Sequence, residues 1–81
     1  MKFSVIKPHS IVQHTIVWVE INTPVGNMVI QEGHAPMIVE IEPNSELLFM
    51  QQNGKQILMI VLQGFMHITR QEIKLLVTKE A

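Results

Sequence analysis

Turn-forming residues divide this chain into short apolar segments, and their spacing limits the fold more than any other feature. Clusters of Pro, Gly, Asn and Ser recur about every 8 to 12 residues, and the segments between them are rich in Val, Ile, Thr and aromatics. No window favours a helix of useful length. The pattern predicts an all-β sandwich or barrel, and 81 residues predict one domain over 1–81.

Eight strands are expected from this punctuation. The Asn53-Gly54 pair predicts a hairpin with a type I′ turn, because that turn needs positive φ at both central residues. In the last strand, alternation directs Ile73, Leu75 and Val77 inward. In the long second strand, alternation places Trp18 on the face of Ile16 and Glu20, opposite the face of Val17, Val19 and Ile21. The expected strands are Phe3–Lys7, Ile11–Asn22, Met28–Gln31, Met37–Ile41, Glu46–Gln51, Lys55–Leu62, Phe65–Thr69 and Glu72–Thr78.

The chain has more apolar residues than a domain of its size can bury. Hydrophobic residues make up 47% of the chain and charged residues 16%, against a usual charged share of about 25%. Several segments, such as 57–62, are apolar on both faces of a strand, which predicts an exposed apolar patch. We expect it to carry some of the flexible methionines, which alternatively fill the core: Met28, Met37, Met50, Met59 and Met66.

The same composition excludes several classes of function. A formal net charge of −1 without runs of like charge argues against nucleic acid or an anionic bilayer as partner. The longest apolar run, 57–62, is far shorter than the roughly 20 residues of a transmembrane helix. There is no cysteine, and the four histidines lack ligand-like spacing, so neither a metal site nor a cofactor is predicted. These histidines are His9, His14, His34 and His67.

Two carboxylates are the only residues whose spacing suggests catalysis. Glu40 and Glu42 lie two apart on one strand, so they face the same side and could divide acid and base roles in a small hydrolase. Nothing in their surroundings predicts burial, and a charged strand edge that blocks aggregation explains them better. We therefore predict no catalytic residues and no enzyme activity for this chain.

The sharpest local signal is the corner Gly33-His34-Ala35-Pro36. Gly33 and Gly26 before it suit positive φ, while Pro36 holds Ala35 extended. Together with its flanking motifs, the corner resembles the N-terminal β-sandwich of the epsilon subunit of F-type ATP synthases, the delta subunit in mitochondria. The flanking motifs are Glu20-Ile21-Asn22-Thr23-Pro24, Glu42-Pro43, Glu46-Leu47-Leu48-Phe49, Asn53-Gly54-Lys55 and Gly64-Phe65.

This resemblance implies a flattened two-sheet sandwich in the rotor's central stalk, without catalytic residues of its own. Such a subunit links the gamma subunit to the c-ring and so couples ion translocation to ATP synthesis. It would lie peripherally on the cytoplasmic face of a bacterial cell membrane, with no membrane insertion. Carried over by position, the c-ring rim would be Pro24, Val25, Gly26, Asn27 and Met28, and the gamma face would include Ser10, Ile38 and Val39.

The chain also departs from the family pattern. Val29 stands where a glycine is usual, and Leu62-Gln63-Gly64 replaces a Ser-Gly-Gly-like stretch. The chain stops at Ala81, whereas most family members continue into a C-terminal helical hairpin that binds ATP or inhibits hydrolysis in many relatives. The resemblance thus implies coupling without that inhibition. The alternative is a free-standing ligand- or peptide-binding sandwich, in which the turn around His34 and an open edge capture an extended segment.

Overall fold

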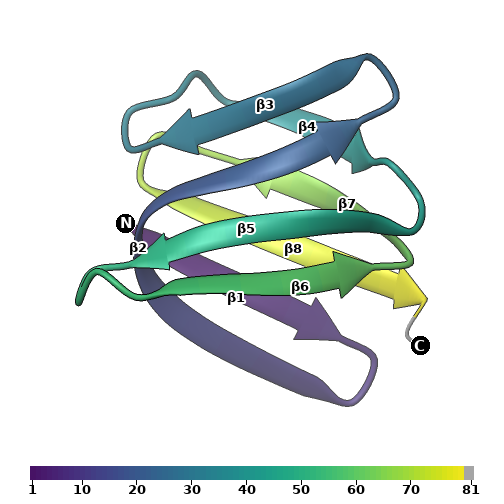
Figure 1. The fold of residues 1–81 in the computed structure, drawn as a ribbon, viewed down its shortest axis with the longest axis horizontal. Helices are drawn as coiled ribbons and strands as arrows, with labels where there is room; N and C mark the ends of the chain where they lie inside the picture. The colour runs from purple at the N-terminus through teal and green to yellow at the C-terminus, as the bar shows by residue number, and fades with distance from the viewer. Residues whose placement is uncertain (80–81) are drawn as a thin grey trace.

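A computed structural model of the protein describes residues 1–79 and confirms the predicted all-β fold of eight strands (Figure 1). The described chain contains no helix, and hence none long and apolar enough to cross a membrane. The strands match the predicted segments to within two residues at each end. They are β1 Lys2–Lys7, β2 Ser10–Thr23, β3 Gly26–Gln31, β4 Met37–Ile41, β5 Ser45–Gln51, β6 Gln56–Val61, β7 Gln63–Ile68 and β8 Glu72–Lys79.

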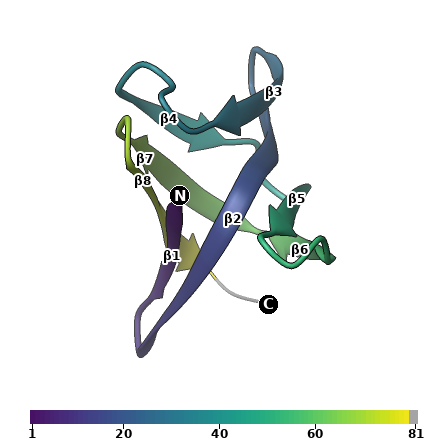
Figure 2. The ribbon, with the colours of Figure 1, turned by 90° about the vertical axis from the view of Figure 1, so that its left-hand side faces the viewer.

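The strands form one strongly curled sheet that folds back on itself as two layers (Figure 2). Sheet A contains β4, β7, β8, β1 and the first half of β2, in that order. Sheet B contains β3, the second half of β2, β5 and β6. β2 therefore belongs to both layers, and its 14 residues allow this double role.

A β-bulge lies where β2 passes from one layer to the other. The register of β2 on β5 shifts between Ile16 and Trp18, so Ile16 is buried together with Val19 and Ile21, while Val17 is exposed. The predicted simple alternation of faces is thus wrong on this strand. A bulge increases local bend and twist, which is what a strand that turns a sandwich corner requires.

The core lies between the two sheets and is made of alternate residues of every strand. Phe3 of sheet A and Phe49 of sheet B meet edge to face, with ring centroids 5.2 Å apart. The His14 ring also packs on Phe49, with ring centroids 4.8 Å apart. The predicted inward side chains of β8, Ile73, Leu75 and Val77, are buried, as the alternation required.

The Asn53-Gly54 hairpin is present, but its turn is not type I′. Gly54 has φ of 88°, whereas Asn53 is not among the described residues with positive φ. The Gly54 N–H donates to the Gln51 carbonyl, and the Gln51 N–H donates to the Lys55 carbonyl, which leaves a three-residue loop. A type I turn followed by a left-handed glycine is the usual solution for three residues.

The turns gather at the two opposite ends of the sandwich (Figure 1). The β2–β3 and β4–β5 turns lie at one end, where the Glu42 N–H donates to the Asn22 carbonyl. The Gly33–Pro36 corner and the β7–β8 turn lie at the other end, where the Gly33 N–H donates to the Arg70 carbonyl. The sandwich therefore separates the predicted rim, 24–28, from the corner, 33–36.

Candidate functional site

The outer face of sheet A, called the A face below, carries a continuous apolar row across four strands. Phe65 of β7 pairs with Leu76 of β8, Leu76 with Ile6 of β1, and Ile6 with Ile11 of β2. Paired residues project from the same side of a sheet, so the four side chains line up side by side. Ile11, Phe65 and Leu76 are exposed. Such a row on an outer surface is typical of a protein interface.

The three residues assigned to the gamma face do not share one orientation. Ile38 projects onto the A face and is 72% exposed, whereas its neighbour Val39 is half-buried and packs against the core. Ser10 begins β2 beside Ile11, at the end of the apolar row farthest from edge strand β4. Ser10 pairs with Lys7, on the side of β1 and β2 that carries Val5 and Val12, so of the three residues only Ile38 projects onto the A face.

The predicted rim is a two-residue turn held by a threonine. Thr23 Oγ1 donates to the Gly26 carbonyl at 2.8 Å and accepts from the Val25 N–H at 3.2 Å. These bonds leave Val25 95% exposed at the tip. Pro24, Gly26 and Asn27 are also exposed, but Met28 pairs with Ile21 and packs against the core. The exposed part of the rim is therefore 24–27.

The corner Gly33-His34-Ala35-Pro36 is anchored to the neighbouring β7–β8 turn. Gly33 has φ of 86°, as predicted, and its carbonyl accepts from Arg70 Nη1 at 3.3 Å. His34 Nδ1 lies 2.8 Å from the Ala35 carbonyl oxygen, which fixes the ring over the corner. These contacts are internal to the corner and to its anchoring turn, so they explain its shape.

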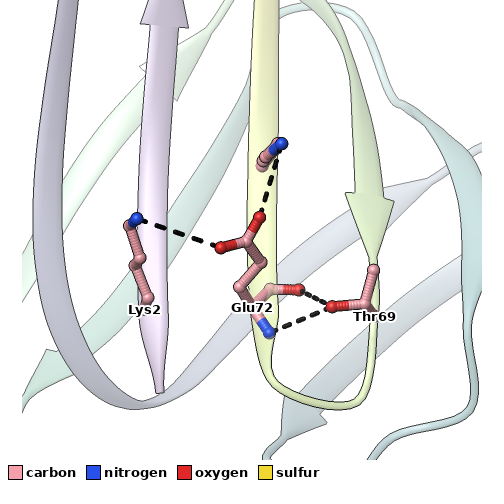
Figure 3. Close-up of polar contacts among 4 residues, drawn as sticks. Lys2, Thr69 and Glu72 are labelled. Carbon is pink, nitrogen blue, oxygen red and sulfur yellow. Dashed lines mark hydrogen bonds and ion pairs between the residues drawn. The ribbon is translucent and has the colours of Figure 1, made fainter.

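The β7–β8 turn that anchors the corner is itself closed by side chains (Figure 3). Thr69 Oγ1 accepts from the Glu72 N–H at 3.1 Å and donates to the Glu72 carbonyl at 2.9 Å. The Glu72 carboxylate lies 4.0 Å from Lys2 Nζ on β1 and 3.4 Å from Lys74 Nζ. These ion pairs lie on the A face, so the Glu72 carboxylate on this face is paired with lysines of the same sheet.

The outer face of sheet B, called the B face below, is a second apolar surface. Across the strands, Val29 and Leu48 both pair with Glu20, and Leu48 pairs with Leu58. The next residues along these strands that share this face include Trp18 and Met50, which pair with each other, and Ile60, which pairs with Glu46. Leu58 and Ile60 are each 56% exposed.

The apolar patch predicted from composition therefore exists on both faces, but methionines contribute little to it. Met66 is fully buried, and Met28, Met37 and Met59 pack against the core. Met50 alone among these five projects outward, on the B face beside Trp18. Branched side chains carry the rest of both surfaces. In the sequence, these surfaces are indicated by segments that are apolar on both strand faces. Such segments do not show which of their residues face the core and which face outward.

The residues considered for chemistry do not converge. Glu40 projects from edge strand β4 and Glu42 follows it, and both are exposed. His14 is half-buried against Phe49, His34 lies at the corner, His67 on the A face and His9 in the β1–β2 turn. Within 1–79, no three His, Asp or Glu side chains group as a metal site would require. The structure thus offers surfaces for contact.

Comparison with known proteins gives one family match and several structural neighbours. Its residues 1–80 match the family model described as ATP synthase, Delta/Epsilon chain, beta-sandwich domain. A search of curated proteins gives no significant match. Among solved structures, a chain of the Euglena gracilis mitochondrial ATP synthase (OSCP/F1/c-ring, rotational state 1) is similar, with 18% identity and a TM-score of 0.86.

A chain of the Tetrahymena thermophila mitochondrial ATP synthase, from a structure of its central stalk and c-ring, is similar at 11% identity and a TM-score of 0.81. The matches cover 95% and 98% of this chain but only 49% and 63% of those chains. The chain thus spans about half to two thirds of its structural neighbours. At these identities, the structural likeness establishes the shared fold.

Proposed function

The chain belongs to the family of beta-sandwich domains of ATP synthase delta and epsilon chains, and from that premise we propose that it is a non-catalytic subunit of the rotor's central stalk. In this role it links the gamma subunit to the c-ring and couples ion translocation to ATP synthesis. It acts at the cytoplasmic face of a bacterial cell membrane, peripherally. Its contribution is mechanical: a close-packed two-layer sandwich holds its two partners in a fixed relation.

The observation that carries this proposal is the position of an apolar row relative to an exposed turn. The A face, with Ile38 at its β4 margin, offers gamma an apolar surface spanning several strands. The β2–β3 turn projects Val25 from one end of the same sandwich, where it would rest on the polar loops of the c-ring. Two contacts at different places on one rigid domain are what a linking subunit needs.

Single cysteines test these two contacts, because the natural chain has none and each introduced thiol is unique. In membranes containing the assembled complex, a photoreactive crosslinker on Val25→Cys should join the chain to the c-ring. The same crosslinker on Ile38→Cys should join it to gamma. Lys55→Cys, in the turn at the opposite end from Val25, is the matched exposed control for the ring contact. Equal c-ring crosslinking from positions 25 and 55 would contradict the proposed rim.

The alternative of a free-standing binding module rests on the sandwich edges. Within the described chain, β3, β4 and β6 each pair along one edge only. β6 carries no charge or proline to protect its free edge, which makes it available for strand addition. The crosslinking experiment separates the two functions, because a free-standing module would give neither gamma nor c-ring products.

A further inference from the structure

We propose that a hollow between the two sheets binds a small apolar carboxylate, an aliphatic or aromatic acid of about six to eight carbon atoms. The hollow lies where β1 and the start of β2 face β5 and edge strand β6. In both views of the ribbon, the β1–β2 hairpin extends beyond β6 (Figures 1 and 2). Sheet B therefore covers the inner side of this hairpin only in part.

The side chains that line the hollow belong to the inner sides of both sheets, yet several of them are accessible. Val12 pairs with Val5, which is 4% exposed, but Val12 itself is 47% exposed. Across the hollow, Ile57 and Met59 of β6 are only half-buried, although their partners on β5 are fully buried. Within residues 1–79, the core is thus left open along this margin and presents an apolar wall to a ligand.

His14 adds a hydrogen-bond donor to this apolar wall. Its ring lines the hollow and packs on Phe49, while Gln51 Nε2 lies 3.5 Å from His14 Nδ1. Because an amide nitrogen donates, this contact assigns the proton of the neutral imidazole to Nε2. Nε2 has no partner within residues 1–79, and it is not sealed off, since every buried side-chain nitrogen or oxygen there has one. It can therefore donate to an acceptor in the hollow.

The charge around the hollow favours an acceptor that is an anion. Lys7 lines the hollow on the same inner side as Val5 and is half-buried there. No acidic residue is among the described residues that line the hollow, and β6 beside it carries no charge. The stem of a lysine packs on apolar groups while its ammonium attracts a carboxylate. The hollow should therefore prefer a carboxylate to an alcohol or an amine of the same shape.

The volume of the hollow sets the size of the apolar part of the ligand. It measures about 150 Å³, and an apolar cavity of about 150 Å³ accommodates a molecule the size of benzene. Pockets that enclose drug-sized ligands are larger, at about 300–1,000 Å³. The hollow thus matches a carboxylic acid with a short chain or a single ring.

An NMR titration of the 81-residue protein tests the site, with hexanoate as the probe. Hexan-1-ol has the same chain without the charge, hexylammonium carries the opposite charge, and acetate lacks the chain. Hexanoate should bind at least about tenfold more tightly than each of these three, with an affinity that falls as salt rises. Intermolecular NOEs should connect the hexanoate chain to the methyl groups of Val12, Ile57 and Met59.

Substitutions separate the apolar wall from the polar groups. Val12→Phe fills the hollow from an accessible position, so it should weaken hexanoate binding at least about tenfold while the fold is kept. Ile11→Phe, at the exposed neighbour on the opposite side of the same strand, is the matched control and should bind hexanoate as the wild type does. The double variant Lys7→Gln/His14→Phe removes charge and donor, so its affinities for hexanoate and hexan-1-ol should agree within about twofold.

Several outcomes would each overturn the proposal: no binding of hexanoate, equal affinities of the wild type for hexanoate and hexan-1-ol, unchanged binding by Val12→Phe, or NOEs to other methyl groups only. A folded double variant that keeps the full preference for hexanoate would do the same. If the double variant does not fold, Lys7→Gln alone decides, and it should lower the preference at least about threefold. None of these measurements involves gamma or the c-ring, so failure of the proposed function is observed separately.

Discussion

A Cβ atom at Gly64 would lie 2.6 Å from the carbonyl oxygen of Leu76 on the neighbouring strand. The obstacle is backbone, which cannot rotate away, and the site lies at the register shift between β7 and β8. We expect Gly64→Ala to lower the free energy of unfolding by about 1–3 kcal/mol, as overpacking does. Urea unfolding followed by circular dichroism measures the loss. Gln63→Ala, at the exposed neighbour, is the control, and equal midpoints for both variants would contradict the close approach.

The effect of a substitution at Asn53 on stability depends on the type of the turn that follows β5. In a type I′ turn, Asn53→Gly would be tolerated because the residue would have positive φ. Here Asn53 lies at the third position of a type I turn, and its Oδ1 accepts from the Lys55 N–H at 2.9 Å. We expect Asn53→Gly to destabilise the fold by about 0.5–1 kcal/mol through lost hydrogen bonding and greater unfolded-state entropy. A neutral or stabilising effect in thermal unfolding would favour type I′.

Thr69 closes the β7–β8 turn by serving as both acceptor and donor to Glu72. Thr69→Val keeps the shape but removes both bonds and leaves the partly buried Glu72 N–H without its hydroxyl acceptor. The expected cost is about 1–2 kcal/mol of unfolding free energy. Thr69→Ser retains the hydroxyl and should stay within about 0.5 kcal/mol of wild type in chemical denaturation. A serine variant as unstable as the valine variant would point to the lost methyl group.

The neighbours Ile38 and Val39 should separate binding from stability. Ile38→Asp places a charge on the A face, so it should weaken gamma binding by at least about 30-fold while the fold is retained. Val39→Asp places the charge against the core and should lower the unfolding free energy by more than about 2 kcal/mol. Affinity for purified gamma and thermal unfolding of both variants test this. Unchanged gamma affinity of a folded Ile38→Asp variant would exclude the A face.

Much of the fold was predictable because punctuation and alternation are local properties. β4 begins and ends at Met37–Ile41, as the flanking turn residues predicted, and the inward set of β8 followed from its period of two. The bulge near Val17 was not predictable, because Ile16 to Val19 is apolar throughout and any register satisfies its pattern. The turn at Asn53 depends on how Gln51 pairs with Lys55, which packing of β5 and β6 decides.

The sequence was sufficient to predict that an exposed apolar surface exists, but not which residues form it. An apolar excess required an exposed patch, yet only the register brings Phe65, Leu76, Ile6 and Ile11 into one row. Likewise, only the assembled sheets show that four of the six basic residues lie on β1 and β8, away from Glu20 and Glu46 of sheet B. Contact residues carried over by position, such as Val39, were assigned without knowing which face they occupy.

A subunit of the central stalk should be held by gamma and the c-ring at the same time. We would add the purified wild-type protein, bearing an affinity tag, to membranes stripped of their own copy, solubilise them, and identify the captured proteins by mass spectrometry. We expect capture of gamma and c-ring subunits together, strongly reduced by Ile38→Asp and unaffected by the exposed-turn control Lys55→Ser. Capture of neither subunit by the folded wild-type protein would contradict it.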